Sequence, residues 1–341
     1  MDGEIDTALT AAFPGREIDR VTKTGPSWNG ANETVGVVFA TGDRAYCKVA
    51  LDGDGTRIAR EHAVIEYLDK KRKWATPDVL AVDPTATPPY LVTSHVRGET
   101  MLDRWDTVDT TPVDTGTTET PQTSQRTTLL WRIGATLAHL HEERFDSHGE
   151  IVGSATGPTP DTESGAPLAL ETGSWPDVLR STLDRTRKIG TSDRLASHYD
   201  AVAACIEANR DRLSGAPAAL LHGDIALPNL IVDGCETITP IDWELAHVGD
   251  PVRDLVRAED QLLSGFDERG PERYTAALYA GYSEHAGGLP PGFDEREPVY
   301  RVVRMLGRSG FIDQWAALLD EPIDEVAARA NAALERRLDA V

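Results

Sequence analysis

The chain has 341 residues, 40% of them hydrophobic and 26% charged, and its 56 acidic and 34 basic residues give a formal net charge of −22. This length supports one or two hydrophobic cores, and the acidity argues against binding to nucleic acid, which requires basic surfaces. No segment has the eighteen apolar residues of a membrane span, and the acidic first residues lack the features of a signal peptide, so we expect a cytoplasmic protein without membrane contact.

Three β-strands are predicted near the N-terminus, at residues 18–24, 34–40 and 44–51. They are short and rich in β-branched residues, and turn signals separate them at residues 25–30 and 41–43. A sheet of this kind can cover a bound nucleotide.

Lys48 lies in the third strand, in the mostly apolar run YCKVA. An unpaired ammonium group is costly to bury, and lysine is scarce in this chain, so we interpret Lys48 as functional rather than as an ordinary surface residue of an edge strand. The following helix, predicted over residues 56–73, offers Glu61 or Glu66 as its anionic partner. We name Glu61 as the partner, although a helical face alone cannot choose between it and Glu66. A pair of Lys48 and Glu61 would hold the ammonium group against nucleotide phosphates. The predicted inward face of this helix is formed by Ile58, Ile65 and Leu68.

The remainder of the chain is predicted to be mainly helical. Residues 89–98 are expected to form a strand that runs into an exposed crossing segment, which ends an N-terminal lobe at residues 1–98 and begins a C-terminal lobe at 99–341. Residues 106–125 are rich in Thr, Asp, Pro and Gly and predict a solvated insertion or linker, and residues 153–173 are similar. Helical periodicity returns at residues 129–143 and 193–213 and through most of 251–340.

A hairpin with polar ends carries the strongest functional signal. The apolar runs at residues 229–232 and 237–241 flank the turn sequence Asp233-Gly234. Pairing about this turn brings Asn229 near Asp242, and Asp224 precedes Asn229 by five residues on the stretch that enters the hairpin. Oxygen ligands of this kind suit Mg²⁺, with Asn229 and Asp242 as the natural ligands, and Asp224 can accept a proton from an attacking hydroxyl. The structural alternative is an ordinary hairpin with polar ends.

The spacing His-x-Asp-x-x-x-x-Asn, here from His222 to Asn229, followed by Asp242 on a strand, resembles the aminoglycoside phosphotransferase and choline kinase-like family of small-molecule kinases. The resemblance implies the bilobal α+β fold of protein kinases, with an antiparallel sheet and a helix in the N-terminal lobe and a mainly helical C-terminal lobe with a catalytic hairpin. It also implies ATP and Mg²⁺ as cofactors, Asp224 as catalytic base, and Asn229 and Asp242 as metal ligands.

The same resemblance bears on four further residues. The Ser94 carbonyl and the Val96 amide would contact the adenine edge, although a plain strand end explains this segment about equally well. His222 would brace the catalytic loop. Gly223 stands where regulated protein kinases commonly have an arginine, so the chain resembles the constitutively active small-molecule enzymes.

These features predict an ATP-dependent phosphotransferase that acts on a hydroxyl of a small molecule such as an aminoglycoside, an amino alcohol, homoserine or a sugar. A nucleotide-binding sensor without transfer activity is the first alternative, which the retention of Lys48, Asp224, Asn229 and Asp242 disfavours. A hydrolase that uses His222 and Asp224 is the second. The sequence does not identify the acceptor. It also does not show a preference for ATP over GTP or an oligomeric state.

Some remaining polar residues have simpler interpretations. Glu244, Glu259 and Asp260 are candidates for the acceptor pocket, although surface solvation is the favoured reading of the last two. His139 and His141 are expected to be one exposed and one buried position of a helix, with metal binding as a remote alternative. Three widely spaced cysteines predict neither a disulfide framework nor a zinc site.

The acid excess predicts that folding depends on high salt, because at 1 M salt the Debye length is only about 3 Å and self-repulsion is screened. Such a composition is typical of proteins from the salty cytoplasm of halophilic archaea. Circular dichroism melts from low to multimolar KCl should show a rising melting temperature. An unchanged melting temperature across this range would contradict the adaptation to salt.

Overall fold

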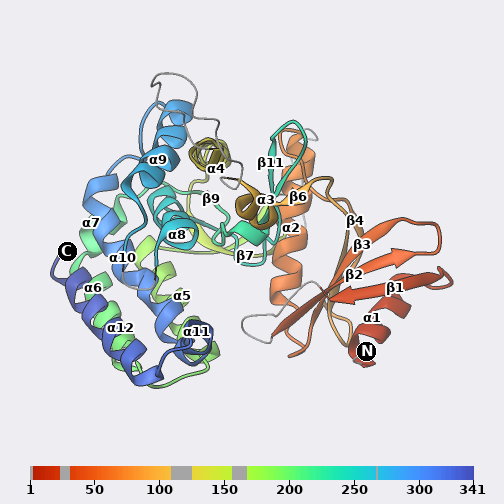
Figure 1. Ribbon diagram of the computed structural model, residues 1–341, viewed down its shortest axis with the longest axis horizontal. Helices are drawn as coiled ribbons and strands as arrows, with labels where there is room; N and C mark the ends of the chain where they lie inside the picture. Colours follow the sequence, from red (N-terminus) through yellow and green to blue (C-terminus); the bar gives the residue numbers. More distant parts are fainter. Residues whose placement is uncertain (1–2, 24–30, 109–124, 156–166, 266–267) are drawn as a thin grey trace, which may run out of the picture. The chain divides into compact units, whose positions relative to one another are not determined.

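The computed structural model describes residues 3–23, 31–108, 125–155, 167–265 and 268–341 (Figure 1). The chain divides into two compact units. Unit 1 contains residues 1–98, 151–171 and 231–246, and unit 2 contains residues 99–150, 172–230 and 247–341. The predicted turn at residues 25–30 and positions 109–124 of the predicted insertion lie outside the described residues.

Unit 1 is built on a five-stranded sheet in which all neighbouring strands are antiparallel. The three strands predicted near the N-terminus are confirmed to within two residues at each end. The order across the sheet is β1 (Ile18–Lys23), β2 (Asn32–Phe39), β3 (Arg44–Ala50), β5 (Tyr90–Ser94) and β4 (Val79–Asp83).

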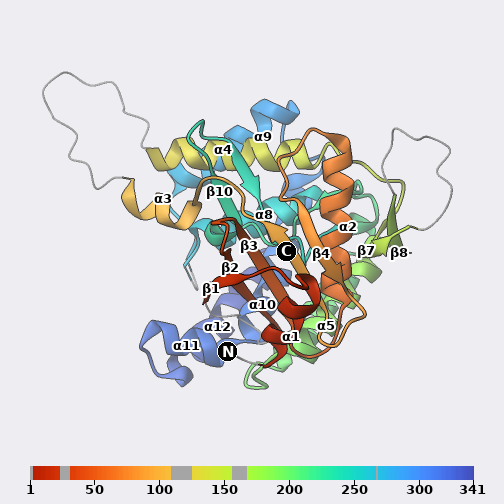
Figure 2. The same cartoon turned by 90° about the vertical axis from the view of Figure 1, so that its right-hand side faces the viewer.

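Two helices, α1 (Gly3–Ala12) and α2 (Thr56–Lys71), accompany this sheet (Figure 2). Successive side chains of a strand point to opposite faces. Cys47 and Val49 pack in one apolar cluster with Ile5 and Leu9 of α1, so the side chain of Lys48 lies on the other face, where it meets α2. The predicted inward stripe of α2 is confirmed, since all three of its residues are at most 2% exposed: Ile58, Ile65 and Leu68.

The prediction of a loop over residues 153–173 is wrong at both ends of this segment, where the structure has strands. Strands β7 (His148–Ser154) and β8 (Leu168–Gly173) are neighbours in a sheet, and the amide of Ala155 donates to the carbonyl of Pro167 at 2.7 Å. The polar composition suggested a solvated segment, but strand pairing satisfies the backbone groups at its ends and buries Leu168. Residues 156–166 lie outside the described part of the chain.

The predicted hairpin is confirmed, with β10 (Leu230–Val232) and β11 (Ile238–Pro240) as its strands. The Asp233 carboxylate organises the turn, because its Oδ1 accepts from the amides of Cys235 at 2.9 Å and Thr237 at 2.8 Å. Asn229 belongs to the short 3₁₀ turn η1 (Leu227–Asn229) that precedes β10, rather than to the strand itself.

Unit 2 is mainly helical, as predicted. Strands β9 (Ala219–Leu221) and β12 (His247–Gly249) pair antiparallel. The described helices are α3 (Met101–Thr107), α4 (Gln125–Leu140), α5 (Trp175–Ile189), α6 (Ser197–Ala208), α7 (Arg210–Ser214), α8 (Pro251–Leu263), α9 (Glu272–Ala286), α10 (Phe293–Ser309), α11 (Ile312–Leu319) and α12 (Ile323–Leu338).

Three helices differ from the sequence-based expectation. Helix α3 extends into the start of the predicted insertion because Thr100 caps it, accepting from the amide of Asp103 at 3.1 Å. Helix α5 was not predicted, although it buries one apolar face that includes Trp175 and Leu179. The single helix expected over residues 193–213 is divided at Asn209 into α6 and α7.

Helices α4 and α9 approach each other closely through two glycines. A Cβ atom added at Gly281 would lie 1.7 Å from the carbonyl oxygen of Trp131, and one added at Gly134 would lie 2.0 Å from the carbonyl oxygen of Leu278. The absence of side chains at both positions therefore sets the distance between the two helices. None of the described helices combines the length and apolar composition that a membrane crossing requires.

The Gly281→Ala variant should be destabilised by about 3 kcal/mol, because overpacking against rigid backbone forces the two helices apart. Gly215→Ala is the matched control, since a Cβ atom there would meet nothing within 4 Å. Denaturant unfolding of both variants measures the difference. Equal stability of the two would contradict the close helix contact.

Candidate active site

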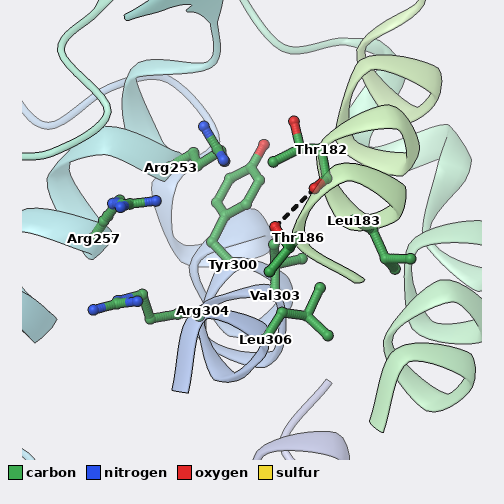
Figure 3. Close-up of a pocket in the computed structure, with 10 residues that line it drawn as sticks. Thr182, Leu183, Thr186, Arg253, Arg257, Tyr300, Val303, Arg304 and Leu306 are labelled. Carbon is green, nitrogen blue, oxygen red and sulfur yellow. Dashed lines mark hydrogen bonds between the residues drawn. The ribbon is translucent and has the colours of Figure 1, made fainter. Parts of the chain in front are cut away.

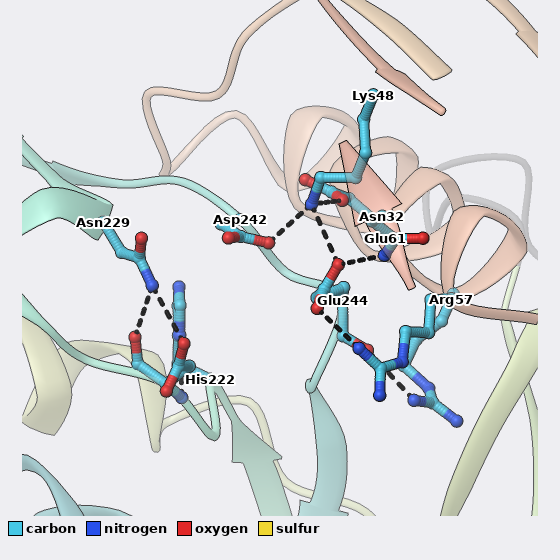
Figure 4. A network of polar contacts seen from close by, with 10 residues as sticks. Asn32, Lys48, Arg57, Glu61, His222, Asn229, Asp242 and Glu244 are labelled. Carbon is cyan, nitrogen blue, oxygen red and sulfur yellow. Dashed lines mark hydrogen bonds and ion pairs between the residues drawn. The ribbon is translucent and has the colours of Figure 1, made fainter. Parts of the chain in front are cut away.

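Lys48 is the centre of a buried ionic cluster in unit 1 (Figure 4). Its Nζ lies 2.6 Å from Glu61 Oε2, 2.6 Å from Asp242 Oδ1 and 3.3 Å from Glu244 Oε2. Only 8% of Lys48 is exposed. The Lys48 cluster consists of these four residues together with Asn32 and Arg57.

Glu61, and not Glu66, pairs with Lys48 in the structure. The Glu66 carboxylate instead accepts a hydrogen bond from Ser154 Oγ at 3.2 Å and lies 3.7 Å from His62 Nε2. The two acids are five residues apart on α2, so their side chains leave the helix in different directions. The burial of Glu61 at 5% exposure agrees with its position against the sheet.

Glu244 has partners on several elements of unit 1. Its carboxylate accepts from Asn32 Nδ2 at 2.6 Å and from Arg57 Nη1 at 2.9 Å, and its backbone carbonyl accepts from Arg60 Nη1 at 3.0 Å. These contacts place Glu244 in the Lys48 cluster. The role of Glu244 in an acceptor pocket stays a prediction.

Asp242 follows β11 with a left-handed backbone conformation, φ +66°. Aspartate tolerates this region better than most residues, and Trp243 beside it is buried at 1% exposure. The carboxylates of Glu61, Asp242 and Glu244 offer oxygen atoms that all lie within 4.8 Å of one another. Oxygen donors at this spacing suit a hard divalent cation.

The cluster holds more negative than positive charge, and its pKa values reflect this. Burial alone would lower the pKa of Lys48, but the negative charges of Asp242, Glu61 and Glu244 raise it well above its usual range. Burial raises the pKa of Glu61 to about 7, with Lys48 opposing and the neighbouring acids adding to the shift. The ammonium group therefore stays charged, and Glu61 holds a proton more readily than an ordinary glutamate.

Asp224 is part of a second polar network, in unit 2. Its Oδ1 accepts from Gln261 Nε2 at 2.7 Å and from Arg257 Nη2 at 3.0 Å, and its Oδ2 accepts from Asn229 Nδ2 at 3.1 Å. Burial would raise the pKa of Asp224, but Arg257, Gln261 and His222 together lower it. The carboxylate is thus ionised and able to accept a proton. Its contact with Asn229 brings together two of the predicted site residues.

The loop that carries Asp224 is anchored by the first turn of α8. The Asp254 carboxylate accepts from the amides of His222 and Gly223, each at 2.9 Å, and lies 3.4 Å from His141 Nε2. His222 is fully buried, and its Nδ1 accepts from the amide of Asp224 at 3.2 Å. This geometry agrees with a bracing role for His222.

Three residues of this network were missed in the sequence: Asp254, Arg257 and Gln261. Their spacing by three and four residues places them on one face of α8, and this regular polar face was the available signal. Its direction toward Asp224 depends on the packing of α8 against β9.

The predicted adenine-contacting residues lie at the end of β5. Ser94 pairs with Ala45 in the sheet, and its amide donates to the carbonyl of Asp78 at 2.8 Å. Val96 follows outside the strand, and within the described residues its amide makes no backbone hydrogen bond.

The prediction that Glu259 and Asp260 lie on the solvated surface is wrong, because they are only 0% and 2% exposed. Glu259 accepts from Tyr279 Oη at 2.7 Å and pairs with Arg301, and Asp260 pairs with Arg308 at 2.8 Å. Both acids are therefore structural ion-pair partners. The sequence did not reveal this, because Arg301 and Arg308 come from α10, 42 and 48 residues further along the chain than their partners.

The two histidines of α4 and its end have separate surroundings. His141 is buried, with Nδ1 3.0 Å from Tyr282 Oη. His139 is partly exposed and lies 3.3 Å from Glu142, which is also 3.4 Å from His285. The predicted burial of one histidine is confirmed for His141, but His141 lies in the turn just after α4 and His139 is only partly exposed.

Comparison with known proteins supports a kinase-like phosphotransferase fold. Over 98% of its length the chain is similar to a protein assigned as a fructosamine-3-kinase from Thermobifida fusca (20% identity, all of that chain, TM-score 0.57) and to macrolide 2′-phosphotransferase MphH from Brachybacterium faecium (18%, 97% of that chain, 0.52). Over 97% it is similar to aminoglycoside phosphotransferase APH(4)-Ia in complex with ADP and hygromycin B (13%, 98% of that chain, 0.60). These likenesses confirm the α+β protein kinase-like fold.

The phosphotransferase enzyme family matches residues 27–299, which is most of the chain. The chain therefore belongs to this family. No curated protein sequence matches it closely.

The pKa of Glu61 leads to a prediction about stability. Because the folded state binds this proton more tightly than the unfolded chain, whose glutamates have an ordinary pKa near 4.5, stability should fall as the pH rises from about 4.5 to about 7. Thermal melts across this range should show a smaller decline for Glu61→Gln than for the parent. Glu66→Gln, on the same helix, is the control, and the idea fails if all three proteins respond to pH alike.

Proposed function

We propose that the protein is an ATP-dependent phosphotransferase that transfers the γ-phosphoryl group to a hydroxyl of a small molecule. The observation that supports this most strongly is the buried Lys48, which is held by Glu61 on one side and by Asp242 on the other. A lysine fixed in this way presents a positive charge to nucleotide phosphates. Structural neighbours have been solved with ADP and hygromycin B, and with streptomycin and ATP.

We assign the proton transfer to Asp224. In the proposed reaction the acceptor oxygen forms a bond to the γ-phosphorus while the bond from that phosphorus to the β–γ bridging oxygen breaks and ADP leaves. The hydroxyl proton passes to the Asp224 carboxylate, which is ionised for this purpose. Arg257 and Gln261 hold the carboxylate in place through Oδ1.

Asn229 and Asp242 are the proposed ligands of Mg²⁺. Asn229 uses its Nδ2 for Asp224, and within the described residues no protein donor contacts its Oδ1. Asp242 adds a carboxylate close to two further acids. When bound, Mg²⁺ would neutralise the charge of the phosphates. Lys48 would then contact the α and β phosphates, and the segment of Ser94 and Val96 the adenine.

The proposed setting of the reaction is a salty cytoplasm, of the kind found in halophilic archaea. The net charge of −22 supports this setting and also supports a small-molecule partner rather than nucleic acid.

Substitution of the two aspartates should separate catalysis from binding. Asp224→Asn should keep the affinity for Mg·ATP and lower kcat by roughly 10²–10⁴, the usual contribution of a positioned base. Asp242→Asn should weaken Mg·ATP binding and raise the Mg²⁺ concentration that turnover requires. Calorimetric titration of Mg·ATP and a coupled ADP assay with an acceptor found by screening, both in molar KCl, measure these effects.

The control is Asp211→Asn, which removes an exposed carboxylate on α7. An Asp224→Asn enzyme with the parental kcat would remove the assignment of the base. Loss of ATP binding in Asp224→Asn would give this residue a different role.

A further inference from the structure

A cavity of about 60 Å³ lies between α5, α8 and α10 of unit 2 (Figure 3). This volume is several times the roughly 10–15 Å³ that one water molecule requires. Three of its lining residues are arginines, namely Arg253, Arg257 and Arg304. In Figure 3 they lie on one side of Tyr300, and Thr182 and Thr186 lie on the other. A cationic cavity is unexpected in a chain with a net charge of −22.

Arg253 is buried without a carboxylate partner. It is 7% exposed, and within the described residues its side-chain contacts are with His247 Nε2, through Nη1, and with the ring of Trp175, 5.9 Å from the centroid. No described carboxylate lies within 4.0 Å of it. The two carboxylates that act on its pKa are already engaged, since Asp254 accepts from two backbone amides and Glu150 pairs with Arg185.

Other buried arginines of the same unit are compensated. Arg296 lies 2.6 Å from Asp250, and Arg301 pairs with both Glu259 and Glu297. A buried charge normally has such a partner. Arg253 is different, and its guanidinium lines an open space.

The two other arginines of the cavity do not balance this charge. Arg304 pairs with Asp260 at 2.8 Å, but Arg308 and Arg337 share the same carboxylate at 2.8 and 3.5 Å. Arg257 uses Nη2 for Asp224. The cavity therefore has an excess of positive charge, and one of its arginines contacts the proposed catalytic base.

The pKa values of these groups agree with the excess. Burial, with repulsion from Arg257, lowers the pKa of Arg253 to about 10, and burial lowers the pKa of Arg304 to about 10 although Asp260 opposes the shift. A bound anion would relieve this repulsion.

We propose that this cavity binds an anionic oxygen group of the phosphate acceptor, so that the substrate is a hydroxy compound with a carboxylate or phosphate group. The proposal rests on the proposed function, since Arg257 links the cavity to Asp224. Arg253 is the principal anion-binding residue. The hydroxyls of Thr182 and Thr186 on the opposite wall donate to the carbonyls of Val178 and Thr182 within α5, so the arginine side supplies the donors for the anion.

Matched acceptor pairs test the charge preference in the unmodified protein. The coupled ADP assay is run in molar KCl with glycerate against glycerol, homoserine against its amide, ribose 5-phosphate against ribose, and kanamycin as a cationic acceptor. We expect kcat/KM to be at least tenfold higher for the member of each pair that carries the carboxylate or phosphate group. The glycerate and homoserine pairs report on a carboxylate, and the ribose pair reports on a phosphate. A preference for neutral or cationic acceptors would overturn the proposal and leave the proposed function intact.

Substitution of Arg253 tests the site itself. Arg253→Gln should raise KM for the anionic acceptor about 10- to 100-fold, as expected for loss of a charged hydrogen bond, with kcat within threefold of the parent and unchanged Mg·ATP affinity. Arg253→Lys should recover part of the affinity. Arg210→Gln, which removes a partly exposed arginine of α7, is the control. A folded Arg253→Gln protein with the parental KM would contradict the assignment.

Binding measurements separate this proposal from the proposed function. Glycerate and ribose 5-phosphate are titrated calorimetrically into protein saturated with the non-hydrolysable analogue Mg·AMP-PNP. Binding that is lost in Arg253→Gln supports the anion site even if no acceptor is phosphorylated, an outcome that would count against the proposed function alone. If Arg253→Gln does not fold, the anion site is tested by the affinity of Arg253→Lys for the anions and by the preference of the unmodified protein within the acceptor pairs. Absence of binding by both anions would overturn the anion site.

Discussion

The candidate site depends on the ion pair between Lys48 and Glu61. A lysine on the inner face of a sheet is costly unless anionic groups surround it, and here they come from α2 and from the segment after β11. The alternation of β3 allows this arrangement, because Cys47 and Val49 fill the apolar cluster on the opposite face. One strand thus contributes to the hydrophobic core with one face and carries the central charge of the site on the other.

Local patterns in the sequence were sufficient for the elements that carry the site. The Asp233-Gly234 turn defined the hairpin, the apolar spacing of α2 defined its buried face, and the run around Lys48 defined its strand. Each of these signals extends over fewer than twenty residues. Regular side-chain periodicity was therefore enough to find them.

The partners of charged residues could not be predicted in the same way. Asp224 bonds to Arg257 and Gln261, which are 33 and 37 residues away, and Asp260 meets arginines from helices that begin more than 30 residues later. Glu259 and Asp260 look like surface acids because helix periodicity alone does not reveal that α10 covers them. In a chain with so many acids, composition described the surface and gave no information about the arginines buried inside.

Helix α8 unites several functions described above. Asp254 holds the loop of the proposed base, Arg257 and Gln261 hold the base itself, and Arg253 contributes the uncompensated charge of the cavity. If both proposals hold, a single helix that carries all four would fix the spacing between the reacting hydroxyl and the anionic group of the acceptor. Changes in acceptor size during evolution would then arise on α5 and α10, the opposite walls of the cavity, while the chemistry on α8 stays in register. The residues that limit acceptor size would then lie on different helices from those that hold the proposed base.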